Sequence, residues 1–234
     1  MMKKTDMIML FQDRNWRFTG LFFSLLIMLV SYPFFGDNAT GAALGGLTSL
    51  LILGAGIYAL RICRWSWILS GTLALCALGA SLLSLLGQVR GSVDTEISFT
   101  AYYVVTTVAV FMEVIRLLRF NMDSVLGAVS IYLLIDVTFG SLFDLLETIE
   151  PGSFRLNAIA AGEATLGFRR LLFFSFMTLT SVGYGDITPV TDHAQSRSIL
   201  ESVAEVLYVA ILVAGVVNAY RTDSSDPENE RGKS

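Results

Sequence analysis

The stretch Thr178-Leu179-Thr180-Ser181-Val182-Gly183-Tyr184-Gly185-Asp186 decides how this chain is interpreted. It lies between two apolar segments and is too short to cross a bilayer, because a membrane-spanning helix needs about 20 residues. Two glycines alternate with other residues, and glycine adopts positive φ at low cost. Such backbone angles turn successive carbonyl groups toward one axis. The alternative interpretation is an ordinary glycine turn between two membrane helices.

The composition is that of a polytopic membrane protein. The 234 residues are 54% hydrophobic and 15% charged, with a mean hydropathy of +0.64, whereas soluble domains carry about 25% charged residues. So little charge would not solvate a globular surface, which excludes a soluble globular protein. We expect six membrane helices from the apolar runs, at about 17–35, 41–60, 66–88, 98–118, 124–146 and 198–220.

Basic residues predict the orientation, because they favour the cytoplasmic side. With a cytoplasmic N-terminus and six crossings, 11 of the 16 Lys and Arg residues fall inside, and the outer side holds Arg90, Arg155, Arg169, Arg170 and Arg197. This bias requires that residues 169–186 do not cross, so the charges predict a re-entrant segment that enters from outside. Irregular backbone at membrane depth is tolerated only where it lines a cavity or is buried in protein, which disfavours the ordinary turn.

The centre of the opening stretch, Val182-Gly183-Tyr184-Gly185, resembles the selectivity filter of potassium channels. The resemblance covers about 125–220, and in that family the carbonyls of the loop replace the water shell of a potassium ion. It implies that the ring of ion sites needs four loops, hence a homotetramer, because each chain supplies one. The ion-binding residues it implies are Ser181, Val182, Gly183, Tyr184 and Gly185, with potassium at the first four.

The expected pore helix, Arg169–Thr180, is long enough for half of a bilayer. Twelve residues at about 1.5 Å each reach about half of a 30 Å core. Its C-terminal end, where the helix dipole is negative, would then face the membrane centre and favour a cation. Thr180 and Ser181 follow with hydroxyl groups, and Ser181 stands where the family commonly has Thr.

Several residues around the loop depart from the family pattern. Phe173 and Phe174 stand where many members have a Trp pair, and Met177 stands where some have a buried Glu. In the family those residues hydrogen-bond the Asp that follows the filter, here Asp186. Phe and Met cannot make these bonds, so we expect a less tightly held Asp186 and a filter prone to inactivating states.

Three further residues are candidates for gating. Asp136 lies in the middle of the fifth helix, where a charge is expensive; it is either a proton-sensitive latch or a hydrogen-bonded packing carboxyl. Glu205 in the sixth helix either lies near the cavity below the filter or bonds the back of the pore helix or Arg197. Gly215 lies lower than the glycine hinge of related channels, so we expect a shifted bending point.

The front half lacks the charges of a voltage sensor. Such a sensor needs several arginines spaced three apart along the fourth helix, and this helix has only Arg116 and Arg119, at its cytoplasmic end. We therefore expect weak or absent voltage dependence. No nucleophile–base pair or metal cluster stands out, and the single histidine, His193, is expected in the solvated loop after the filter, so we expect no enzyme and no cofactor beyond permeant potassium.

The sequence thus predicts an all-α membrane protein with six transmembrane helices, a re-entrant pore helix and a selectivity filter. We expect a potassium-selective channel; the alternatives are a non-selective cation channel and the pore subunit of a potassium uptake transporter. Its partners would be its own copies and the lipid bilayer, without nucleic acid, in a prokaryotic plasma membrane with both termini cytoplasmic; a regulatory partner is unknown. The expected parts are a cytoplasmic N-terminus 1–16, a four-helix domain 17–120, a pore domain 121–220 and a disordered cytoplasmic tail 221–234.

Overall fold

The computed structural model describes residues 17–34, 39–60, 64–85, 93–116, 122–157 and 166–224. This part of the chain is mostly helical. It contains α2 (Arg17–Ser31), the short 3-10 helix η1 (Tyr32–Phe34), α3 (Ala39–Ala59), α4 (Arg64–Leu85), α5 (Val93–Arg116), α6 (Met122–Ile149), β1 (Phe154–Leu156), α7 (Phe168–Leu179), β2 (Ile187–Pro189) and α8 (Asp192–Ser224). The expected N-terminus 1–16, Arg119 and residues 225–234 lie outside the described residues.

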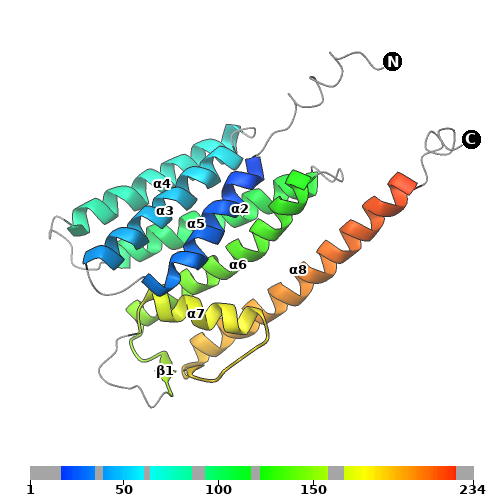
Figure 1. Cartoon of the computed structure of the whole chain (residues 1–234). Helices are drawn as coiled ribbons and strands as arrows, with labels where there is room; N and C mark the ends of the chain where they lie inside the picture. The colour runs from blue at the N-terminus through cyan, green and yellow to red at the C-terminus, as the bar shows by residue number, and fades with distance from the viewer. Residues whose placement is uncertain are drawn as a thin grey trace, which may run out of the picture.

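The long helices form one bundle from which α8 diverges (Figure 1). α2 packs between α3 and α6, and α5 packs between α4 and α6. The short α7 crosses beneath this bundle and contacts α6 and the first part of α8. The loop 180–186 connects the end of α7 to β2. It runs beside the start of α8 (Figure 1).

The described helices have the surface of a membrane protein. Two of them are long and apolar enough to cross a bilayer, within Val93–Ile115 and Val125–Ile149, and three shorter apolar helices accompany them within Phe18–Phe34, Leu44–Ala59 and Ser70–Gly79. Large apolar side chains lie exposed around the bundle, such as Leu47 on α3 and Leu75 on α4. A helix that is apolar on all sides is typical of membrane spans.

The structure adds one short sheet to the expected helices and corrects the start of the last helix. The described part of the chain is mostly helical, as expected, and β1 and β2 form one antiparallel pair, with Arg155 opposite Thr188. The last helix begins at Asp192 rather than near residue 198, because the hydroxyl of Thr191 accepts the N–H of Ala194 at 3.3 Å and caps the first turn. His193 therefore lies exposed in the first turn of α8 rather than in a loop.

The first helix is attached to the second half of the chain at both ends. Near its N-terminus, the Oδ1 atom of Asp123 on α6 accepts the backbone N–H groups of Phe18 and Thr19 at 3.1 and 3.2 Å, and also the Thr19 hydroxyl. A carboxylate is a suitable acceptor for N–H groups in the first turn of a helix. After its C-terminus, the Tyr32 hydroxyl donates to the carbonyl of Arg169 on α7 at 3.2 Å. The first helix thus supports both α6 and α7.

Candidate functional site

The position of α7 depends on a close approach to α6. Leu171, Leu172 and Leu179 of α7 are buried, and Leu172 lies against Gly140 of α6. A Cβ atom on Gly140 would lie 2.9 Å from Leu172 Cδ1 and 3.0 Å from Leu172 Cα. Only glycine allows the two backbones to come this close, and small residues have this role between membrane helices.

The loop after α7 has positive φ at every second residue. The φ angles are +56° at Ser181, +52° at Gly183 and +75° at Gly185, whereas Val182 and Tyr184 do not have positive φ. This alternation of φ falls on three of the five residues that the resemblance implies as ion-binding residues.

Ser181 is the residue of this loop for which the sequence offered no conformational signal. It is the sole non-glycine residue with positive φ in the described ranges, and the left-handed region costs an ordinary residue about 1–2 kcal/mol. Serine has no β-branch, and positive φ is a genuine outlier for β-branched residues. A serine is thus better suited than a threonine to this backbone position.

The inner end of the loop is tied to the C-terminus of α7. The Gly183 N–H donates to the Met177 carbonyl at 3.0 Å, and the Ser181 N–H donates to the Thr178 carbonyl at 3.0 Å. Thr180 directs its hydroxyl back to the Phe176 carbonyl at 2.6 Å. Met177 therefore contacts the loop through its backbone carbonyl, which does not depend on its apolar side chain. Thr180 contacts the last turn of α7 through its hydroxyl group.

The two phenylalanines have different surroundings. The Phe173 ring stacks on the Tyr184 ring, with centroids 6.2 Å apart and an angle of 13° between the planes. Phe174 is buried and packs edge-to-face against Phe143 of α6 and Phe154 of β1, with centroids 5.3 and 5.4 Å away. Phe173 thus lies directly behind the loop, whereas Phe174 belongs to an apolar cluster that joins α7 to α6 and β1.

The outer end of the loop is held by a residue that the sequence did not single out. Asn157, just after β1, donates its side-chain amide to the Gly185 carbonyl at 3.1 Å and to Thr188 Oγ1 at 3.0 Å. Its backbone N–H donates to the Asp186 carbonyl at 2.7 Å. Nothing in the local sequence distinguishes this asparagine from an ordinary loop residue, because the contact depends on the pairing of β1 with β2.

A buried polar group joins three helices behind the loop. The Ser175 hydroxyl of α7 lies 2.9 Å from the backbone carbonyl of Asp136 on α6, and it donates to the carboxylate of Glu201 on α8. Asp136 and Glu201 are completely buried. The carboxylate oxygens of Asp136 and the Oε2 atom of Glu201 have no hydrogen-bond partner in the described part of the chain. The acid that reaches the back of α7 is therefore Glu201.

Glu205 and Gly215 lie further along α8, away from this buried group. Glu205 lies one turn after Glu201 and is partly exposed in the single chain. Gly215 lies about three turns after Glu205 and is also partly exposed. Among the described residues, no group of three or more His, Cys, Asp and Glu could hold a metal ion. Within residues 180–185 the oxygen atoms are the backbone carbonyls and the hydroxyls of Thr180, Ser181 and Tyr184.

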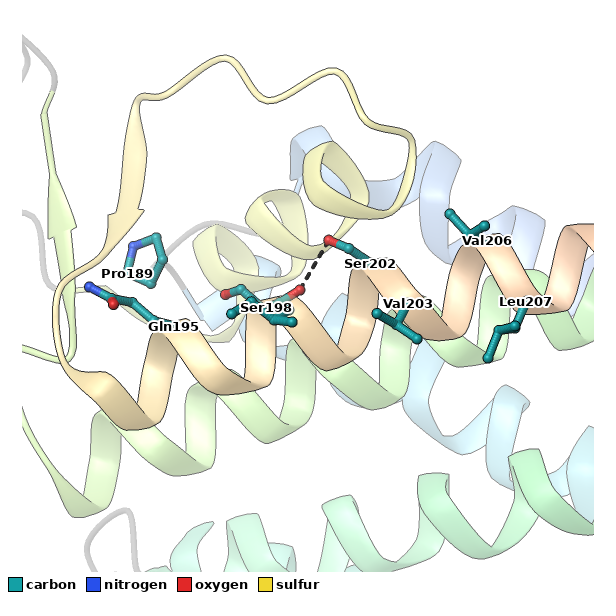
Figure 2. A pocket seen from close by; sticks show the side chains of 8 residues that line it. Pro189, Gln195, Ser198, Ser202, Val203, Val206 and Leu207 are labelled. Carbon is teal, nitrogen blue, oxygen red and sulfur yellow. Dashed lines mark hydrogen bonds between the residues drawn. The ribbon is translucent and has the colours of Figure 1, made fainter.

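One face of the site is open in the single chain. Val182 is 49% exposed and Tyr184 70% exposed. Beside the loop, a groove of about 710 Å³ follows α8 and is mostly apolar (Figure 2). The residues that line it are Pro189, Gln195, Ser198, Ile199, Ser202, Val203, Val206 and Leu207. Most of the large side chains on this face of α8 are therefore apolar and unpaired within one chain.

Comparison with known proteins places this site in a recognised kind of domain. Residues 128–222 match a family model whose description is ion channel. No curated protein and no solved structure matches the chain. The matched segment contains most of α6, all of β1, α7, the loop and β2, and most of α8. The site thus lies in a segment similar to ion channels, which supports a membrane ion channel rather than an enzyme.

Proposed function

We propose that this chain conducts potassium ions selectively and passively through a pore formed by four copies. The observation that carries the proposal is the alternation of positive φ at Ser181, Gly183 and Gly185. A loop of this conformation presents carbonyl oxygens that replace the hydration shell of a dehydrated cation. Val182 and Tyr184 between these positions match the potassium-selective pattern rather than that of a non-selective channel.

The proposed fourfold arrangement is supported by the surfaces that one chain leaves exposed. A single loop supplies carbonyls on one side of an ion only, and its Tyr184 ring is mostly exposed. The open face of α8 carries Ile199, Val203 and Val206, which are 64, 49 and 65% exposed. Contiguous exposed apolar patches are typical of protein or membrane contacts, and packing against a neighbouring copy would bury this face while closing a ring of loops.

The topology belongs to the same proposal. Six helices would cross a prokaryotic plasma membrane with both termini cytoplasmic, and α7 with the loop would enter from outside. The helices within 17–120 would form a scaffold around the pore domain 121–220, with weak or no voltage dependence. The contacts of α2 with Asp123 and of Tyr32 in η1 with Arg169 support a scaffold role, because they connect the start of the chain to α6 and α7.

Passive flux through purified protein tests the function. The protein would be reconstituted in planar bilayers, and the reversal potential would be measured with high potassium and low sodium on one side and the reverse on the other. A reversal potential near the potassium equilibrium value is expected. A value near zero would instead assign a non-selective cation channel, and the absence of any passive current at all tested voltages and pH values would contradict a channel.

A further inference from the structure

We infer that Asn157 is a positioning residue that clamps the outer end of the ion-conducting loop from a separate element. The inference rests on the proposed function and adds a determinant of how the loop is held. Asn157 follows β1 and lies 28 residues before Gly185 in the chain. It thus connects the segment before α7 to the end of the loop after α7.

The hydrogen-bond chemistry of Asn157 fits this role. Its amide group has two N–H donors, and the structure uses both, toward the Gly185 carbonyl at 3.1 Å and Thr188 Oγ1 at 3.0 Å. A carbonyl oxygen accepts but does not donate, so only the amide nitrogen can face Gly185. A third bond, from the Asn157 backbone N–H to the Asp186 carbonyl at 2.7 Å, is independent of the side chain.

The rest of the loop offers little else to hold this end. The Gly183 bond to Met177 fixes the inner end, whereas Gly185 has no side chain and a φ of +75°. Behind the loop, Phe173 contacts Tyr184 through ring stacking, and neither Phe173 nor Met177 carries a side-chain N–H or O–H donor. The amide of Asn157, just after β1, therefore supplies a side-chain hydrogen bond that Phe173 and Met177 cannot supply.

Three variants separate the clamp from the strand pairing beside it. Asn157→Leu keeps a similar size but removes both amide donors, and Asn157→Ala truncates the side chain in case leucine does not fit. Thr188→Val is the matched control, because it removes the second acceptor while the bond to Gly185 remains. In each variant the backbone bond from residue 157 to Asp186 is retained.

The first measurement is hydrogen–deuterium exchange of the backbone amides of residues 183–187 in the purified full-length protein, which does not depend on conduction. Loss of one hydrogen bond of ordinary strength is expected to raise exchange about fivefold in Asn157→Leu and Asn157→Ala. Thr188→Val is expected to stay within about twofold of the wild type. Unchanged exchange in both Asn157 variants, or an equal rise in Thr188→Val, would overturn the clamp.

The second measurement is the potassium-to-sodium permeability ratio of the same variants in bilayers. A positioning role predicts a ratio several-fold lower in Asn157→Leu and near the wild-type ratio in Thr188→Val. Faster exchange with an unchanged ratio would overturn the positioning role and leave Asn157 as a structural residue. If the wild type carries no current, the proposed function fails, and the exchange data still decide whether Asn157 clamps the loop.

Discussion

Individual backbone angles define the loop that carries the proposed function. Gly183 and Gly185 have the positive φ expected of glycines in such a loop, and Ser181 adopts it without that advantage. A side chain added at Gly183 or Gly185 would meet no neighbouring atom within 4 Å in the single chain. Within one chain, a substitution at Gly183 or Gly185 is therefore disfavoured by the backbone conformation and not by a steric clash.

Gly185→Ala is expected to abolish most potassium conduction. Alanine in the left-handed region costs about 1–2 kcal/mol, so the residue will favour another conformation and rotate its carbonyl away. Gly152→Ala is the matched control, because Gly152 also has positive φ, +90°, and also has open space around it, but it lies in the turn before β1. Potassium flux into liposomes would be compared, and equal flux in the two variants would contradict the assignment of the loop.

Ser175→Ala is expected to destabilise the protein by about 1–3 kcal/mol, because it leaves the buried Glu201 carboxylate without its donor. Ser202→Ala serves as control. Ser202 is on the same helix as Glu201 and donates only to the Ser198 carbonyl one turn earlier, at 3.1 Å. Denaturant unfolding in detergent would show the difference, and equal midpoints would indicate that the three-helix contact contributes no stability.

Pairs of elements decide where the loop lies. α7 depends on α6 through Gly140 and on α8 through Ser175, while β1 and β2 connect the segments before and after α7. The first half of the chain contributes through α2, whose Phe18 N–H donates to Asp123 of α6, and through Tyr32 of η1, which donates to Arg169 of α7. The half-length helix is therefore held from several sides, which suits an element that must keep its C-terminal end in one place.

Gly140→Ala is expected to cost about 1–3 kcal/mol, because the new methyl group would contact the Leu172 backbone at 3.0 Å and force α6 and α7 apart. Gly79→Ala on α4 is the control, since its added Cβ would meet nothing within 4 Å. Thermal unfolding of both variants in the same detergent gives the comparison. A Gly140→Ala protein as stable as Gly79→Ala would show that the helices separate without cost.

A single chain leaves two apolar surfaces exposed. Val182 and Tyr184 of the loop are exposed, and the groove along α8 is lined mostly by apolar side chains (Figure 2). The bundle of α2 to α5 carries exposed apolar side chains as well, such as Leu75 on α4. The two kinds of apolar surface correspond to the two partners proposed for this chain, a second copy and lipid.

Val206→Asn tests which partner covers α8. Val206 is 65% exposed in the groove, and Leu75 on α4 is 71% exposed on the bundle. If copies pack on α8, an unpaired amide there costs about 1–3 kcal/mol per subunit, and the assembly should dissociate in detergent. Leu75→Asn should leave the assembly intact. Native mass spectrometry gives the number of chains, and a monomeric wild type or an intact Val206→Asn tetramer would contradict the proposed packing.

Much of the architecture could be predicted because it depends on local composition. The membrane class follows from the apolar runs, and the positions of the helices agree with the structure to within a few residues at most ends. A short helix is expected at 169–180 and is observed at Phe168–Leu179. The start of α8 is expected too late, because the first turns after Thr191 are polar and the expected helices are defined by apolar runs.

The remaining features depend on contacts between residues far apart in the chain. Positive φ at Gly183 and Gly185 could be predicted from the residue type. Ser181 adopts positive φ within a loop that is hydrogen-bonded to Met177 at one end and to Asn157 at the other. The chain alone left open whether an acid of the last helix reaches the pore helix. The packing of α8 against α7 places Glu201, rather than another acid of α8, against Ser175. The pairing of β1 with β2 places Asn157 beside Gly185. Local sequence determines which helices form; the free energy of packing them together determines which side chains meet at the loop.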